Sequence, residues 1–247
     1  MAAGCASSLL RGTPNNVEET YNNAMQDLKD GYYPEAISGF TDVKTKYPYT
    51  KYAALADLRI ADTHFERGKF LEAIDAYRSF LKMHPNHAEL PYAMLRIGEA
   101  YYEQIPSDWW LLPPSHEKDQ GNTRAAIAAY RDLLARYPAS KEAESARGRL
   151  DDCRRRLADH EMYVARFYFK RERYKAAAER AEGLVRDYPS LGFDEEALWL
   201  MAQSRFELGE VEPARAAATR LAKDFPNGSY SSAARRLLDE LGAAGGG

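Results

Sequence analysis

The sequence lacks the features that mark several large classes of protein. It has two cysteines, too few for a disulfide scaffold, and no run of about 18 apolar residues that would span a bilayer. Its formal net charge of -3 gives no general reason to bind nucleic acid or an anionic membrane. With 45% apolar and 12% aromatic residues, the chain is too rich in both for wholesale disorder. These values suit a folded, helix-rich protein of 247 residues.

Catalytic and metal-binding motifs are also missing. The sequence contains no GxSxG, no HExxH and no phosphate-cradling glycine loop. None of the five histidines stands at zinc-ligand spacing from a cysteine or a carboxylate. A hydrolase that uses carboxylate pairs is a hypothesis without residues at catalytic spacing. We therefore expect a non-enzyme with no catalytic residues, no cofactor and no metal.

The chain does contain an internal repeat. An aromatic residue or histidine precedes proline at Pro48, Pro85, Pro138, Pro189 and Pro226. Twelve residues before each proline stands an alanine, and twenty-four before stands another small residue once an insertion in the third unit is allowed. The two sets are Ala36, Ala73, Ala126, Ala177 and Ala214, and Ala24, Ala61, Gly98, Ala165 and Ala202. Small residues let two helices cross closely, and proline ends the second helix.

These marks predict an all-α fold, a superhelical solenoid of five tetratricopeptide-type helix-turn-helix repeats. Turns are expected near Gly31, Gly68 and Gly209. The 51-residue step between Pro138 and Pro189 contains no proline and many helix formers. It predicts one helix of roughly 30 residues, joining repeats three and four.

The expected organisation has four parts. Residues 1–16 form an N-terminus and tether, 17–139 form repeats one to three, 140–241 form the long helix with repeats four and five, and 242–247 form a flexible tail. A solenoid of this kind presents a concave groove, which binds peptides or partner domains. The predicted first helices place six residues toward that groove: Tyr21, Asp62, Phe65, Glu66, Glu99 and Tyr102. Generic groove lining is an equally good interpretation of these six.

Two further features have alternative interpretations. Trp109 and Trp110 lie in a proline-rich insertion, where they either plug the superhelix or contact a partner. Residues 146–186 hold twelve Lys/Arg against seven Asp/Glu. That run is either a solvated helix face or, with its interleaved aromatic residues, a surface for an acidic partner.

The N-terminal "AAGC" resembles the second half of a lipoprotein processing signal, after which Cys5 would be acylated. The charged and apolar parts of a signal peptide should precede it, and only four residues do. From these residues alone, a processing site and an accidental likeness are both open.

Four stretches are narrower than a repeat consensus: "DGYYPEAI", "KYPYTKYA", "NTRAAIAAYRDLLARYPAS" and "RLADHEMYVARFYFKRERYKAAAERAEGLVRDYP". In them the chain resembles the BamD family, the tetratricopeptide lipoproteins of the outer-membrane β-barrel assembly machinery. Five units, an aromatic loop in unit three and a long helix into unit four are that family's layout. Residues 105–120 differ in detail from the family, so the resemblance says less about contacts there.

The resemblance implies a non-catalytic scaffold, lipid-anchored through Cys5 to the outer membrane and facing the periplasm. The C-terminal repeats would bind the periplasmic domains of the BamA insertase. Arg180 matches a family arginine at that contact, with Arg186 and Asp187 adjacent. The N-terminal repeats would receive unfolded β-barrel outer-membrane proteins, and other assembly-complex lipoproteins would be further partners. The alternative is a periplasmic repeat adaptor for the cell-division or peptidoglycan machinery.

Overall fold

A computed structural model describes residues 16–106 and 118–244. These residues form eleven α-helices and no strand, so the predicted all-α tetratricopeptide-type solenoid is confirmed. They fall into two compact units, which are described separately. Unit 1 extends to Gln104 and includes Ala125–Arg147, and unit 2 comprises Ile105–Arg124 and the chain from Gly148 onward.

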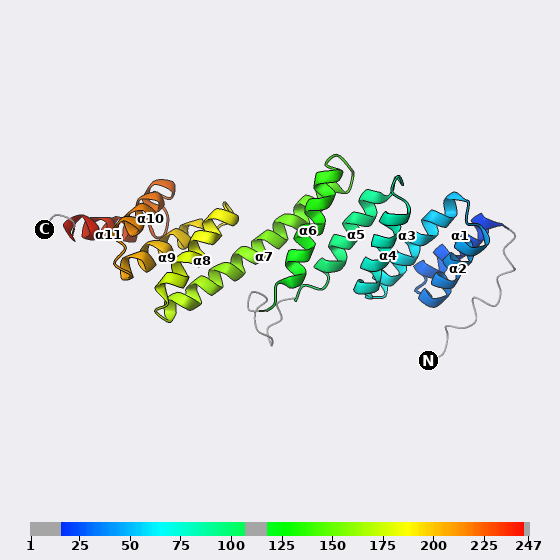
Figure 1. Ribbon diagram of the computed structural model, residues 1–247, viewed down its shortest axis with the longest axis horizontal. Coiled ribbons are helices and arrows are strands. Elements are labelled where there is room, and N and C mark those ends of the chain that lie inside the picture. The colour runs from blue at the N-terminus through cyan, green and yellow to red at the C-terminus, as the bar shows by residue number, and fades with distance from the viewer. Residues whose placement is uncertain (1–15, 107–117, 245–247) are drawn as a thin grey trace. The chain divides into compact units, whose positions relative to one another are not determined.

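Unit 1 consists mainly of paired helices (Figure 1). They are α1 (Val17–Lys29), α2 (Tyr33–Lys46), α3 (Lys51–Glu66), α4 (Phe70–Met83), α5 (Leu90–Tyr102) and most of α6 (Gly121–Arg136). From α1 to α5 each helix packs against the next, and α1 also contacts α3. This contact between first helices of neighbouring repeats is what stacking predicts.

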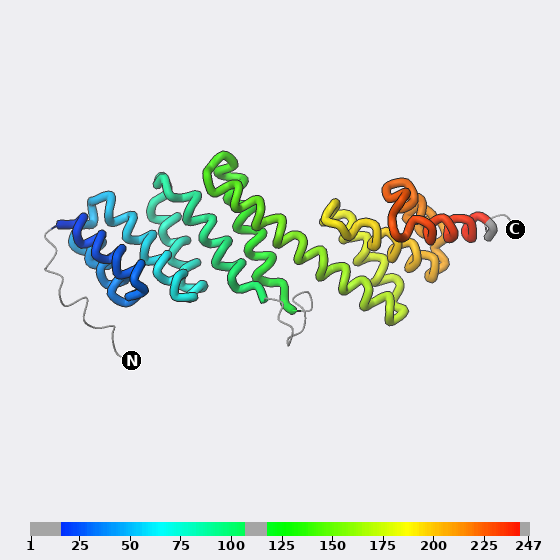
Figure 2. The backbone as a smooth tube through the Cα atoms, turned by 180° about the vertical axis from the view of Figure 1, so that it is seen from behind, coloured from blue at the N-terminus to red at the C-terminus, as the bar shows by residue number. Residues whose placement is uncertain are grey.

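Unit 2 contains most of α7 (Ala143–Lys170), followed by four shorter helices (Figure 2). These are α8 (Tyr174–Asp187), α9 (Asp194–Glu207), α10 (Val211–Asp224) and α11 (Ser231–Ala244). The predicted long helix is confirmed, because α7 has 28 residues. The sequence did not predict α11, which follows the last repeat and runs into the range expected as a tail. Its Leu237 and Leu241 are buried in the core of unit 2.

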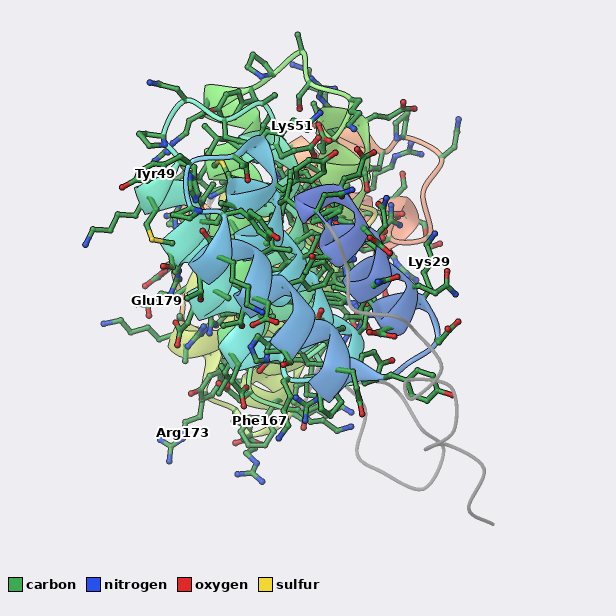
Figure 3. All side chains as sticks on the ribbon, turned by 90° about the vertical axis from the view of Figure 1, so that its right-hand side faces the viewer. Lys29, Tyr49, Lys51, Phe167, Arg173 and Glu179 are labelled. Carbon is green, nitrogen blue, oxygen red and sulfur yellow. The ribbon has the colours of Figure 1, made fainter. Side chains whose placement is uncertain are left out.

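The predicted small residues lie at the helix crossings. All nine alanines are at most 1% exposed, and Gly98 is buried. Gly98 shows why the position is small, because a Cβ atom there would stand 2.4 Å from Cε1 of Tyr130. The prolines act as predicted too, since α2, α4, α6, α8 and α10 each end two residues before one. The exposed Tyr49, which follows Pro48, is in the turn after α2 (Figure 3).

The first helix of a repeat ends in the same way in four units. At Gly31, Gly68 and Gly209 the backbone has φ of 79°, 69° and 73°, so the predicted glycine turns are confirmed. In each turn the glycine N–H and the next N–H donate to carbonyls of the preceding helical turn, which is a Schellman motif. The equivalent residue between α7 and α8 is Glu172, with φ of 58° and the same two hydrogen bonds. Repeat four therefore places a glutamate where the left-handed backbone favours glycine.

Candidate functional site

A buried carboxylate organises the first helices of unit 1. Asp62 in α3 is 6% exposed. It accepts hydrogen bonds from the hydroxyls of Tyr77 at 2.5 Å and Tyr92 at 3.0 Å, and it pairs with the Arg59 guanidinium. The three donors come from α3, α4 and α5, so one carboxylate joins the second repeat to the third.

Arg96 of α5 is a second centre in the same network. Its guanidinium donates to Glu99 at 2.9 Å, to Glu66 at 3.0 Å and to the hydroxyl of Tyr77 at 3.3 Å. The same guanidinium lies 3.6 Å from the centre of the Phe65 ring, close enough for a cation–π contact. Because Tyr77 bonds to both Asp62 and Arg96, the two centres form one network.

Helical spacing brings these side chains to one face. Residues three, four or seven apart share a face of an α-helix. In α3 the residues at that spacing are Arg59, Asp62 and Glu66, and in α5 they are Tyr92, Arg96 and Glu99. We name these six residues, together with Tyr77 and Phe65, the unit 1 network. Its three carboxylates face two guanidinium groups, and all five charges are paired within it.

The network holds its two tyrosines and its arginines in fixed protonation states. Burial and then the negative charge of Asp62 raise the pKa of Tyr92 to about 12. The same two causes raise the pKa of Tyr77 far above its ordinary value. Burial alone would lower the pKa of Arg59, but the Asp62 carboxylate and the Tyr21 hydroxyl raise it overall. The phenols therefore stay neutral donors and the guanidinium stays charged at any physiological pH.

The structure brings most of the predicted groove residues together, in differing roles. Phe65, Glu66 and Glu99 belong to the network, with Glu66 the most exposed of the three. Asp62 differs from the expectation, because its carboxylate is buried and fully engaged inside the protein. Tyr102 is half-buried near the end of α5.

Tyr21 joins the network from α1. Its ring packs 5.6 Å from Phe40 and 5.3 Å from Tyr52, and its hydroxyl accepts a hydrogen bond from Arg59 at 3.4 Å. The first three repeats are therefore connected through one set of contacts, from Tyr21 through Arg59 and Asp62 to Tyr92.

Sequence reasoning missed Arg59, Arg96 and Tyr92. A signal was present, because repeats two and three both have an arginine three residues before an acid, as Arg59–Asp62 and Arg96–Glu99. The equivalent positions of the other repeats do not have this pair. A pattern common to all five repeats therefore does not reveal this arginine–acid pair, which only repeats two and three share.

Unit 2 presents Arg180 on α8. Its Nη1 donates to Glu161 of α7 at 2.8 Å, and its side chain remains 46% exposed. Surface pairs of this kind contribute little to stability, at most about 1 kcal/mol. The contact instead limits the directions in which the guanidinium can point.

The other two predicted residues of this surface bond to each other. Arg186 donates from Nε and Nη2 to the two carboxylate oxygens of Asp187, at 2.8 and 2.9 Å. Both side chains are more than half exposed. The hydrogen bond from Arg186 lowers the pKa of Asp187, so the pair stays ionised.

Three predicted residues, Cys5, Trp109 and Trp110, lie outside the described residues. Within residues 16–106 and 118–244, no group of three His, Cys, Asp or Glu side chains could hold a metal ion. No helix in those ranges is long and apolar enough to cross a membrane. A cavity of about 370 Å³ lies between α4, α5 and α6, and none of the predicted groove residues lines it.

Comparison with known proteins shows the family to which the chain belongs. Residues 14–221 match the family YfiO, described as outer membrane lipoprotein. The chain belongs to this family. A relative from Caulobacter vibrioides, named outer membrane protein assembly factor BamD, is 28% identical over 97% of this chain and 77% of its own length. A relative of the same name from Neisseria meningitidis serogroup B is 29% identical over 87% of this chain and 81% of its own.

The range that matches this outer membrane lipoprotein family includes parts of both compact units and every predicted site residue except Cys5. Cys5 stands ahead of the matched range, so its acylation stays a prediction. Among solved structures, the TPR2AB domain of yeast Sti1 aligns with 92% of this chain and 86% of that domain, at 15% identity and a TM-score of 0.46.

Proposed function

We propose that this member of the outer membrane lipoprotein family is a non-catalytic, lipid-anchored scaffold in the assembly of outer-membrane β-barrel proteins. The observation that carries the proposal is the family match over residues 14–221, with relatives named outer membrane protein assembly factors. The acyl chains on Cys5 would supply the anchor. Several chains on one cysteine are enough for stable attachment to a membrane.

Unit 2 would bind the periplasmic domains of the BamA insertase through Arg180, aided by Arg186 and Asp187. The geometry supports this assignment, because Glu161 holds the half-exposed Arg180 guanidinium in place before binding. A preoriented arginine loses less side-chain entropy when it meets a partner carboxylate. A guanidinium can also bind a carboxylate through two parallel hydrogen bonds.

Unit 1 would receive the C-terminal targeting strand of an unfolded barrel protein. In such a strand aromatic and polar side chains alternate. Phe65, Glu66 and Glu99, which are all more accessible than Asp62, offer a ring and carboxylates beside each other. Tyr21 and Tyr102 would extend this surface along α1 and α5. Asp62 would not contact the strand itself but would hold Tyr77, Tyr92 and Arg59 in place.

The test is binding of the full chain to the periplasmic domains of its own insertase. Arg180→Glu should weaken binding roughly tenfold, about 1.4 kcal/mol, because a half-exposed contact contributes less than a buried one. Arg220→Glu is the matched control, since Arg220 is an exposed arginine of the same unit that also pairs with a carboxylate, Asp224. Equal affinity for the wild type and both variants would remove Arg180 from the interface.

Two other results bear on the proposal as a whole. Binding by neither the wild type nor the variants would reject the insertase assignment and favour the cell-division adaptor. The anchor is tested by fractionation of cells expressing Cys5→Ala, which should leave the membrane fraction. Retention of that variant in the membrane would reject acylation at Cys5.

A further inference from the structure

The turn between α7 and α8 concentrates positive charge. Four cations, Lys170, Arg171, Arg173 and Lys175, surround a single carboxylate, Glu172, and all five side chains are exposed. Within the part of the chain that the structure describes, none of the four cations has a carboxylate at ion-pair distance. Figure 3 shows the Arg173 side chain extending outward from the ribbon.

Several other arginines of unit 2 are paired with carboxylates. Arg166 donates to Glu196 at 2.6 and 2.5 Å, and Arg205 donates to Glu210 at 2.6 Å and Glu182 at 3.2 Å. Carboxylates are therefore available in this unit, but Glu172 is the only one within residues 163–175. Four neighbouring cations without an ion pair distinguish this turn from those paired arginines.

An aromatic surface lies beside the cations. Phe167, near the end of α7, is 37% exposed, and the Arg171 guanidinium lies 4.1 Å from the centre of its ring. Tyr168 and Tyr163 extend the surface, with ring centres 5.7 and 6.5 Å from that of Phe167. A guanidinium stacked on a ring keeps its N–H edge available for carboxylates.

The backbone of the turn is strained. Glu172 has φ of 58°, which costs a non-glycine residue roughly 1–2 kcal/mol. Such strain is found preferentially at functional sites. Here the strained residue stands between Arg171 and Arg173, so the turn that carries it also sets the directions of both arginines.

We propose that this cationic turn, residues 163–175, is a docking surface for an acidic segment of a partner protein that also carries aromatic side chains. Carboxylates of the segment would pair with Arg171 and Arg173, and its rings would pack along Phe167 and the tyrosines. Charge complementarity supports an acidic partner. An acidic polypeptide fits better than a lipid surface, because Phe167 is the only apolar side chain of residues 163–175 that is classed as exposed, and the Arg171 guanidinium lies over its ring.

The test is fluorescence anisotropy of a short labelled peptide in which glutamate alternates with phenylalanine, titrated with the full chain. A peptide with lysine in place of glutamate is the ligand control. The double variant Arg171→Glu, Arg173→Glu should weaken binding roughly tenfold or more, and added salt should weaken binding of the wild type. The matched protein control is Arg220→Glu with Arg235→Glu, two exposed arginines of α10 and α11, which should bind as the wild type does.

Glu172→Gly gives an independent check that does not risk unfolding. It removes the only carboxylate of the turn and relieves the backbone, so binding of the acidic peptide should tighten.

Equal affinity for the wild type and the double variant, or no binding by the wild type, would overturn the proposal. Binding to phosphatidylglycerol vesicles without binding to the peptide would overturn it in favour of a lipid surface. Arg180→Glu should leave peptide binding unchanged, which separates this result from the insertase test.

Discussion

The two compact units share one repeat skeleton but fill it differently. Four residues after the second-helix alanine, unit 1 has Phe40, Tyr77 and Tyr130, and unit 2 has Ala181 and Ala218. All five side chains are fully buried. The same position in the repeat is therefore occupied by a large ring in one unit and by a methyl group in the other.

This difference determines whether the interior of a unit contains polar contacts between its repeats. A tyrosine at that position in α4 brings a hydroxyl to the buried Asp62, so unit 1 joins its repeats through a polar network. The core of unit 2 is mainly alanine and leucine, and ion pairs such as Arg166–Glu196 lie at its edge. Repeat spacing thus specifies the fold of both units. The residue at one interior position determines whether the core contains a polar network, as in unit 1, or is apolar, as in unit 2.

The largest expected effect follows removal of the network's central carboxylate. Asp62→Ala leaves the Tyr77 hydroxyl without the acceptor of its proton and Arg59 without its counter-charge. Loss of one member of a buried ion pair costs roughly 3–5 kcal/mol. Chemical denaturation should show that loss in the free energy of unfolding.

The control for this prediction is the carboxylate of unit 2 that pairs with Arg166. The side chains of that pair are 42% and 30% exposed, so Glu196→Ala should cost about 1 kcal/mol or less. If the two variants lose the same stability, the network of unit 1 is no more than a set of surface pairs.

A smaller effect is expected from adding one methyl group to a helix crossing in unit 1. Gly98→Ala would place a Cβ atom 2.4 Å from the Tyr130 ring, and overpacking of this kind costs roughly 1–3 kcal/mol. Gly148→Ala is the matched control, because Gly148 lies in α7 with no atom within 4 Å of the added Cβ. That substitution should stabilise the chain by about 0.5–1 kcal/mol through helix propensity. Thermal unfolding of both variants measures the difference, and a change of the same sign in both would reject the steric account.

The repeat skeleton could be predicted from sequence because its causes are local. A small residue where helices cross, a glycine in a left-handed turn and a proline at a helix end each act within one repeat. The long helix α7 was predictable for the same reason, from the absence of proline over its length. These features depend on spacing along the chain, which the sequence displays directly.

The candidate site was predicted only in part, because it depends on contacts between repeats. Arg96 meets Glu66 across thirty positions of the chain, and Tyr92 meets Asp62 across the same separation. Periodicity identified the faces of α3 and α5 but not which side chains would pair across them. It therefore predicted Asp62 as a groove residue, although the Tyr77 and Tyr92 hydroxyls enclose it. The turn at Glu172 was not predicted, because glycine is the sequence signal for such a turn and the fourth repeat has no glycine there.

A stabilising change of about 1 kcal/mol is expected at the turn of unit 2. Glu172→Gly relieves a left-handed backbone that glycine adopts freely. Part of the gain is lost because glycine makes the unfolded chain more flexible. Gly68→Ala in unit 1 is the reverse substitution. Gly68 has φ of 69° and open space around the Cβ position, so this variant should lose a similar amount of stability through backbone strain alone. Denaturation midpoints of both variants give the comparison, and a destabilised Glu172→Gly would mean that the glutamate makes compensating contacts.

The last effect is confined to alkaline pH and belongs to unit 1. Burial and the charge of Asp62 raise the pKa of Tyr92 to about 12, while a tyrosine of an unfolded chain titrates near pH 10. The folded state therefore holds the phenolic proton more tightly, so this contribution to stability is complete below about pH 10 and is lost as pH rises from there to about 12. Tyr92→Phe should show a shallower fall in the free energy of unfolding over that window. Tyr49→Phe is the control, because the Tyr49 side chain is fully exposed. Equal slopes for the wild type and Tyr92→Phe would show that the phenol is not held by the network, and the contrast between the two units would then depend on packing alone.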